Sequence, residues 1–176
     1  MKINSKSRIY DVSESLQINV NDNELWEIIS SPGNLNNCHP YCEKNNVKKW
    51  PGVGSSDSIM YFNGLTLKRE FIEWNVNKGY ALIIGKGKLA AANVFWEINT
   101  INNNSSTLTI RIRLFSDVIL FKYLKIFRAM LTYFHLKPKM SAYTTAVLKG
   151  FKHYAETGEP VQKNQFGYHS MFSTKG

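Results

Sequence analysis

The sequence offers little that would support a disulfide scaffold, a membrane span or an export signal. Its 176 residues include only two cysteines, which are too few for a disulfide-stabilised fold. No stretch of about 18 apolar residues is free of charge, so we expect no transmembrane helix. The opening residues, MKINSKSRIY, lack the apolar core of a secretory signal peptide. We therefore expect a cytoplasmic protein with reduced cysteines.

Motifs of catalysis and of nucleic-acid binding are also missing. None of the GxSxG, HExxH, P-loop or Rossmann glycine patterns occurs in the sequence. Helix-turn-helix, zinc-finger and RNP patterns are absent as well. The net charge of +9 could attract nucleic acid or anionic lipid, but the lysines are scattered. We interpret the charge as a solvated surface, and we expect no nucleic-acid partner and no cofactor.

Alternating apolar and polar residues predict antiparallel strands through most of the chain. In residues 8–20, Tyr10, Val12 and Ile18 share one face, while polar residues occupy the other. Turn signals such as Asn63-Gly64 separate the later strands. One face of the sheet should be buried and the other solvated. The further strands are predicted at 43–49, 56–62, 65–76, 80–86, 88–100 and 107–115.

Helices are predicted after the first strand and at the end of the chain. Asn21 is a good N-cap, and Glu24 three residues later completes a capping box. A final helix is predicted over 139–156, ended by Gly158 and followed by Pro160. The strongly apolar segment 118–136 predicts one more helix, with its polar residues in a narrow stripe. Pro138 should break or kink that helix.

This order of elements predicts an α+β fold in which a curved antiparallel sheet wraps around a terminal helix and leaves a cavity. The stretches INVNDNELWEIISSPGNLNNCHPY and VLKGFKHYAETGEPVQKNQFGYHSMFS resemble the SRPBCC superfamily, most closely its bacterial polyketide-cyclase/dehydrase-like members. The resemblance covers residues 8–173. It implies the helix-grip fold of START domains and of the birch-pollen allergen, with about seven strands around a long C-terminal helix. We expect one START-like domain over 1–176, with a polar arm (1–7), an extra apolar helix (117–137) and an extended tail (157–176).

The segment NNCHPYC, residues 36–42, places a histidine between two cysteines. A structural zinc site usually needs four ligands, and the sequence has no second cysteine pair. A redox CxxC motif is excluded because three residues separate Cys38 from Cys42. We therefore expect no metal, and we interpret the segment as the passage from the helices to the sheet, with His39 and Pro40 at the cavity rim.

Two charged residues are candidates for polar contacts inside the cavity. The position of Glu14 in its strand puts a carboxylate on the apolar face, where it needs a partner or a proton. It orients a polar ligand group, is turned outward by a bulge or by the strand end, or pairs with Arg69, Arg111 or Arg113. Arg69 and Glu70 have opposite orientations in their strand, and we favour Arg69 as the inward residue and as an anion partner.

Aromatic residues in the strands could stack on a flat apolar ligand or could simply form the core. Tyr143 lies on the apolar face of the final predicted helix. The residues we expect to contact a ligand are Glu14, His39, Tyr61, Arg69, Trp74, Tyr80, Trp96 and Tyr143.

The function predicted is the binding of a hydrophobic small molecule, such as a lipid, a polyketide or an isoprenoid-like compound, in an internal cavity. The alternative is a polyketide cyclase or aromatase of the same fold, in which Glu14, His39 or a tyrosine moves protons. A third hypothesis is an interaction through 118–136, either with a membrane surface or in a homodimer. For this segment we favour burial against the sheet over membrane binding. The sequence leaves the question of catalysis open.

Overall fold

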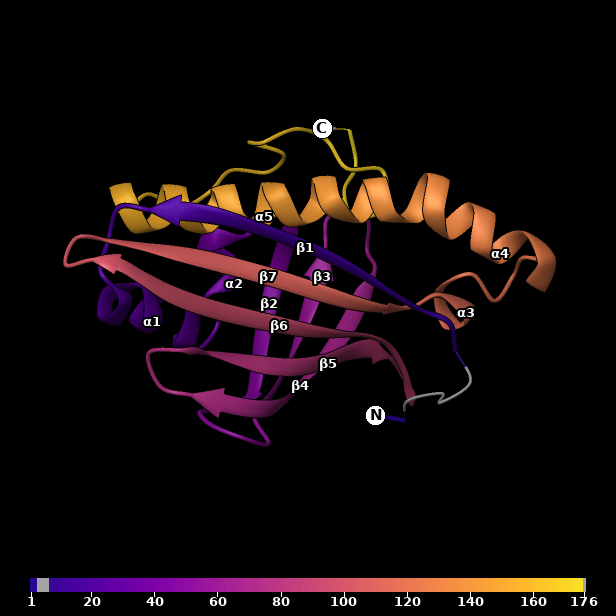
Figure 1. Cartoon of the computed structure of the whole chain (residues 1–176), viewed down its shortest axis with the longest axis horizontal. Coiled ribbons are helices and arrows are strands. Elements are labelled where there is room, and N and C mark those ends of the chain that lie inside the picture. Colours follow the sequence, from indigo (N-terminus) through magenta and orange to yellow (C-terminus); the bar gives the residue numbers. More distant parts are fainter. Residues whose placement is uncertain (3–6, 176) are drawn as a thin grey trace.

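Seven strands form one antiparallel sheet in the computed structural model, which describes residues 1–2 and 7–175 (Figure 1). Their order across the sheet is β1-β7-β6-β5-β4-β3-β2. All the predicted strands are confirmed, and their ends differ from the prediction by at most two residues. The strands are β1 (Ile9–Ile18), β2 (Cys42–Lys49), β3 (Ser56–Tyr61), β4 (Thr66–Asn75), β5 (Gly79–Lys86), β6 (Leu89–Asn102) and β7 (Ser105–Phe115).

Two short helices lie between β1 and β2, and the remaining helical elements follow β7. The long helix α5 runs beside β1 along the sheet, and α4 extends beyond its end (Figure 1). Of the predicted polar arm 1–7, residues 3–6 lie outside the described part of the chain. The helical elements are α1 (Asp22–Ser30), α2 (Leu35–Cys38), α3 (Ser116–Ile119), α4 (Lys125–Leu131), the π-helix η1 (Thr132–Leu136) and α5 (Lys137–Thr157).

The sheet is curved, which is what leaves room beneath it. Register shifts interrupt the pairing of β2 with β3, β4 with β5, β5 with β6 and β6 with β7, and such bulges bend a strand and increase its twist. As a result β2 and β3 run steeply across the direction of β1 and β7 in Figure 1. The inner face carries the apolar residues of the alternating patterns, including the buried Trp96, Ile98, Leu108 and Ile110.

The segment 118–136 is not the single helix that its pattern predicts. Residues 120–124 form a turn between α3 and α4. The Arg128 guanidinium group holds this turn, because it donates hydrogen bonds to the carbonyl oxygens of Phe121 (3.0 Å) and Tyr123 (2.9 Å). Many of the apolar side chains of α4 and η1 are exposed rather than packed on the sheet.

Pro138 does not break the helix, which was one of the two effects predicted for it. The helical path continues from α4 through η1 into α5. Just before the proline, the Lys137 amide donates to the Thr132 carbonyl five residues earlier, which makes a wider turn than that of an α-helix. A wide turn at this place relieves the contact between a proline ring and the preceding turn, which otherwise kinks a helix.

No helix in the described part of the chain is both long enough and apolar enough to cross a lipid bilayer.

Candidate ligand-binding cavity

A cavity of about 720 Å³ lies between the inner face of the sheet, α5 and the C-terminal tail. Most of its lining comes from aliphatic side chains of the sheet, such as Leu82, Val94 and Ile112, and from Met140 and Val147 of α5. This volume is within the range of cavities that hold small organic molecules. The polar or ionisable side chains in the lining are His39, Tyr61, Arg69, Lys86, Asp117, Tyr143 and Thr144.

Three exposed residues in the lining mark where the cavity reaches the surface. Lys86 and Leu89 flank the turn between β5 and β6, and Phe121 lies in the turn between α3 and α4. Leu89 and Phe121 are 55% and 64% exposed. The opening of the cavity therefore lies between this hairpin and the turn after α3.

A chain of hydrogen bonds runs along one buried side of the cavity. The Tyr41 amide donates to His39 Nδ1 at 3.1 Å, so the ring hydrogen of His39 is on Nε2. His39 Nε2 then donates to the Tyr143 hydroxyl at 2.9 Å. The Tyr143 and Tyr61 hydroxyl oxygens are 3.1 Å apart. We call His39, Tyr61, Arg69 and Tyr143 the polar wall of the cavity.

Burial keeps the polar wall uncharged at its histidine and its tyrosines. Removal from water, together with the smaller effect of the positive charge of Arg69, lowers the pKa of His39 to about 3. Burial also raises the pKa of Tyr61 to about 12 and raises the pKa of Tyr143 well above its usual value. At neutral pH the imidazole is therefore neutral and both phenols keep their hydrogens.

The one strong charge on the polar wall is balanced inside the protein. Arg69 Nε donates to Asp57 Oδ1 at 2.7 Å, and its Nη2 donates to Asp57 Oδ2. Both side chains are almost fully buried. Burial by itself lowers the pKa of Arg69, but the Asp57 carboxylate more than offsets this and raises that pKa. The anion that Arg69 binds is thus an internal carboxylate on the neighbouring strand β3.

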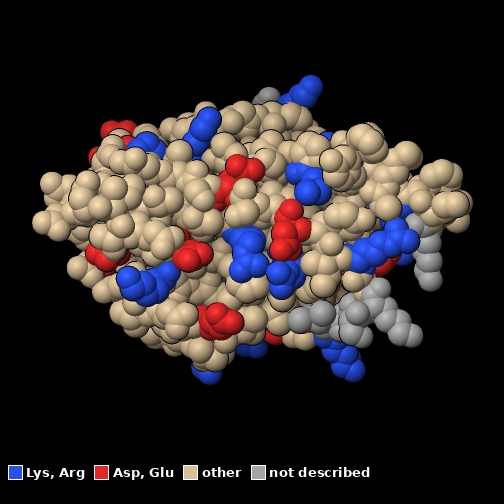
Figure 2. Space-filling view, in the orientation of Figure 1, with Lys and Arg blue, Asp and Glu red and all other residues tan. Residues whose placement is uncertain are grey.

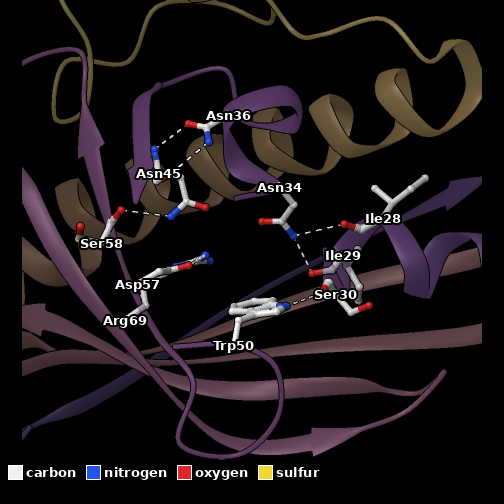
Figure 3. Close-up of polar contacts among 10 residues, drawn as sticks. All are labelled: Ile28, Ile29, Ser30, Asn34, Asn36, Asn45, Trp50, Asp57, Ser58 and Arg69. Carbon is white, nitrogen blue, oxygen red and sulfur yellow. Dashed lines mark hydrogen bonds and ion pairs between the residues drawn. The ribbon is translucent and has the colours of Figure 1, made fainter. Parts of the chain in front are cut away.

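Asparagine contacts fix the loop that carries His39 (Figure 3). The backbone amide of Asn45 donates to Asn36 Oδ1 at 2.7 Å, and Asn36 Nδ2 donates to the backbone carbonyl of Asn45 at 3.2 Å. Asn45 Nδ2 in turn donates to the Ser58 carbonyl of β3. These bonds tie α2 to the start of the sheet, so they hold the intervening residues in place.

Gly150 allows α2 and α5 to approach closely. A Cβ atom at this position would lie 2.2 Å from the Cys38 carbonyl oxygen, which no larger residue tolerates without movement of the backbone. The close approach places His39, the residue after Cys38, beside Tyr143 on α5. The glycine therefore helps to assemble the polar wall.

The C-terminal tail closes one side of the cavity. It turns back after α5, where the Val161 amide donates to the Asn37 carbonyl and the Asn164 amide to the Pro40 carbonyl. Phe172 is buried and packs against the rings of Tyr61 and Tyr143, with centroid distances of 4.6 and 4.5 Å. The tail thus contributes to the cavity wall.

The structure brings five of the eight predicted ligand-contacting residues into the lining: His39, Tyr61, Arg69, Trp96 and Tyr143. Trp74 and Tyr80 lie outside it, in a cluster with Trp26 near α1, where their rings stack at 5.7 Å. Glu14 is also outside the lining. Its carboxylate accepts a hydrogen bond from the Ser141 hydroxyl of α5 at 2.5 Å. That partner is none of the arginines that the sequence suggested.

Both cysteines of the NNCHPYC segment are buried free thiols. Burial raises the pKa of Cys38 and raises that of Cys42 to about 12, so neither thiol is an activated nucleophile. Among the described residues, no group of three histidine, cysteine or acidic side chains is placed to hold a metal ion.

The residues that sequence reasoning missed are Asp57 and Phe172. Asp57 stands in a short strand where neighbouring serines hide any charge pattern, and its importance depends on pairing with β4. Phe172 stands in a tail without periodicity, and only the tertiary path of the tail brings it to the cavity.

The fold is the helix-grip fold, in which a seven-stranded antiparallel sheet packs against a long C-terminal helix, as predicted. Its structural neighbours are SRPBCC/Bet v 1-like proteins. No protein-family model and no curated protein matches the sequence, so the likeness is one of structure.

Three solved structures illustrate the likeness. The Zhui aromatase/cyclase from Streptomyces sp. R1128 has a TM-score of 0.62 and 13% identity, over 88% of this chain and all of that one. Ara h 8.0201 has a TM-score of 0.61 and 10% identity, over 85% and 99%. A norcoclaurine synthase point mutant from Thalictrum flavum, in complex with a transition-state analogue, has a TM-score of 0.58 and 12% identity, over 86% and 99%. Identities this low establish the shared fold alone.

Proposed function

We propose that this protein binds a hydrophobic small molecule, such as a lipid, a polyketide or an isoprenoid-like compound, in the cavity beneath the sheet. The observation that carries this proposal is the cavity itself, which has a volume of about 720 Å³ and a mainly aliphatic lining. Burying apolar ligand surface contributes ~25 cal/mol per Å². The polar wall supplies the few directional contacts that fix the orientation of a ligand in such a site.

A neutral fluorescent probe, N-phenyl-1-naphthylamine, tests whether the cavity accepts a guest. We expect the protein to bind it with one-to-one stoichiometry. Ala92 is buried in β6 and lines the cavity, so Ala92→Phe should place a ring in the space that the probe needs. If the new ring displaces part of the probe, the probe loses about 2 kcal/mol of binding free energy, which is within the range for burying one aromatic side chain. The affinity for the probe would then fall roughly 30-fold. Fluorescence titration measures the change.

The matched control is Ala142→Phe, the same substitution at an exposed position of α5. It should leave the affinity for the probe unchanged. Equal affinities for the wild type and Ala92→Phe would show that the probe binds elsewhere, and the proposed cavity site would then be wrong.

An enzyme of the same fold, such as a cyclase or an aromatase, is the alternative that the polar wall favours. A wholly apolar lining would suit a carrier, whereas His39, Tyr61 and Tyr143 form a connected polar group in the lining. Their protonated phenols could polarise a carbonyl group. The two readings differ in what happens to a compound that co-purifies from the host: an enzyme converts it over time, whereas a carrier releases it unchanged.

A second proposed function, docking on a membrane surface, is favoured by the exposed side chains around the opening. The α4 end of the molecule presents mainly uncharged side chains in Figure 2. Contiguous exposed apolar surface of this kind marks an interaction site. We define the apolar end patch by its exposed residues: Phe121, Tyr123, Leu124, Ile126, Phe127, Met130, Tyr133 and Phe134.

The charges near the patch favour an anionic bilayer over a second copy of the chain. No aspartate or glutamate occurs between Asp117 and Glu156, whereas lysines and an arginine recur through that segment. Asp117 itself is paired with Arg128, at 3.1 Å. A two-fold dimer through the patch would bring like charges together, whereas each lysine near an anionic membrane contributes ~1 kcal/mol.

Vesicle co-sedimentation tests the membrane proposal. The protein should sediment with phosphatidylcholine vesicles that contain about a third phosphatidylglycerol. Ile126 is the most exposed of these residues at 79%, so Ile126→Asp should lower the partition constant onto the vesicles roughly tenfold or more, the worth of a buried aliphatic side chain. The matched control is Ile101→Asp, since Ile101 is 49% exposed at the far end of β6 (Figure 1).

Sedimentation that is equal for Ile126→Asp and wild type would contradict membrane docking by this patch. So would concentration-dependent dimerisation, lost in Ile126→Asp, in a protein that ignores the vesicles. That outcome would assign the patch to a second copy of the chain.

A further inference from the structure

The polar wall holds one phenolic hydrogen for which the described part of the protein has no acceptor. His39 Nε2 donates to the Tyr143 oxygen, because His39 Nδ1 is already occupied by the Tyr41 amide. Between Tyr143 and Tyr61 there is one contact, of 3.1 Å, and it uses one hydrogen. The two phenols carry two hydrogens in all. Whichever phenol donates in the Tyr61–Tyr143 contact, the hydroxyl hydrogen of the other remains.

That remaining hydrogen lies in an environment that penalises an unpaired donor. Tyr61 is 1% exposed, and Tyr143 is half-buried against the tail. Both residues line the cavity. A buried donor that lacks a partner costs about 1–3 kcal/mol, and a site of this kind rejects molecules that cannot pair with it.

The charges at the polar wall indicate that the ligand group that accepts this hydrogen bond is uncharged. The Arg69 guanidinium is bound through two of its nitrogens to Asp57, and the pair is nearly excluded from solvent. Among the described residues, the only other cationic side chain in the lining is the exposed Lys86 at the opening. A ligand carboxylate at the polar wall would therefore be a third buried charge without a counter-charge, which is costly.

We propose that the ligand is an apolar molecule with an uncharged hydrogen-bond acceptor, such as a ketone, ester or quinone carbonyl, and that the Tyr61–Tyr143 pair donates its remaining hydrogen to it. This inference rests on the proposed function, because it concerns what the same cavity selects. It also assigns the two phenols as redundant donors. Removing either hydroxyl leaves one phenol, whose hydrogen is then free for the ligand.

Benzophenone and diphenylmethane are matched probes, because they differ only in a carbonyl group that replaces a methylene group. The measured quantity is the ratio of the two dissociation constants, for the wild type, Tyr61→Phe, Tyr143→Phe and the double variant. The preference for benzophenone in each single variant should stay within about twofold of the wild type. In the double variant it should fall roughly five- to tenfold, the worth of one neutral hydrogen bond. Taking the ratio of two affinities cancels general effects of each substitution on the cavity.

The carbonyl stretching band of bound benzophenone gives a second readout. It should lie at a lower wavenumber in the wild type than in the double variant, since a hydrogen bond weakens the C=O bond. Diphenylmethane should bind the double variant at least as tightly as the wild type, which shows that the cavity is intact.

The outcomes separate this inference from the function on which it rests. If neither probe binds the wild type, the proposed cavity function fails and the inference fails with it. If both bind, but the ratio of their affinities is the same in the wild type and the double variant, the hydrophobic cavity stands and the acceptor site is wrong. A ratio that drops fully in one single variant contradicts the redundancy of the two phenols.

Discussion

Replacing Asp57 with alanine is expected to lower the free energy of unfolding by about 3–5 kcal/mol. The carboxylate is the partner of a guanidinium group that is 4% exposed. Without it, the positive charge of Arg69 stays in the interior with no compensating charge, and that is the costly state. Urea denaturation measures the loss. Asp57→Asn, which removes the charge but keeps the shape, should retain a folded protein for the measurement if the alanine variant unfolds.

Two comparisons make this prediction specific. Asp11→Ala breaks an ion pair between side chains that are 41% and 37% exposed, and an exposed pair contributes about 0–1 kcal/mol. The double variant Asp57→Leu/Arg69→Met removes both buried charges and should recover most of the stability lost in Asp57→Ala. Similar losses of unfolding free energy for Asp57→Ala and Asp11→Ala would mean that Arg69 does not depend on Asp57 to neutralise its buried charge.

The second large effect is on the acid stability of the protein, through His39. Its pKa is about 3 in the folded protein, against 6.5 as its ordinary value. The unfolded chain therefore binds a proton more readily between these pH values, and stability falls as pH decreases through this window. This histidine contributes up to about 1.4 kcal/mol per pH unit. Relative to His39→Gln, the wild type should lose stability by about that slope between pH 6 and pH 4.

The comparison depends on the slope and not on the stability at one pH. His39→Gln also loses hydrogen bonds, so its stability at pH 7 should already be lower. His135→Gln, at an exposed position, controls for the removal of one imidazole from the unfolded chain. Parallel curves for the wild type and His39→Gln from pH 6 to pH 4 would show that His39 is not held neutral by burial.

The sheet could be predicted from the sequence because its signals are local. Alternation along a strand depends only on which face is buried, and turn residues such as Asn63-Gly64 mark where strands end. The N-cap is local too: the Glu24 amide donates to Asn21 Oδ1, three residues away. Signals of this kind do not depend on contacts with distant parts of the chain.

The helical segment before α5 could not be predicted in the same way. An apolar run with a polar stripe predicts a helix packed along its apolar face. Here the turn at 120–124 is held by Arg128, and the π-turn accommodates Pro138. Both features depend on specific contacts that cannot be read from the spacing of apolar and polar residues. The apolar face is exposed because the sheet that could cover it ends before α4 (Figure 1).

The polar wall was partly accessible from the sequence. His39 was predicted at the cavity rim, Tyr61 as an aromatic residue of a strand, and Arg69 from its inward-facing position in its strand. Their connection was not accessible, because it joins α2, β3 and α5 across 82 and 104 residues. Glu14 was selected by the same argument, yet a single hydroxyl from α5 satisfies it outside the cavity. A side chain that faces inward is therefore not always a side chain that faces the cavity.

Native mass spectrometry of the protein purified gently from its own host tests whether the cavity holds a small apolar molecule. We expect a non-covalent complex of one chain with one small molecule, which organic extraction releases as an apolar compound. A sample stripped by that extraction should take up one N-phenyl-1-naphthylamine molecule per chain. Detection of the bare polypeptide alone, both as purified and after incubation with an excess of the probe, would contradict the proposed binding, because the cavity beneath the sheet would then hold no guest.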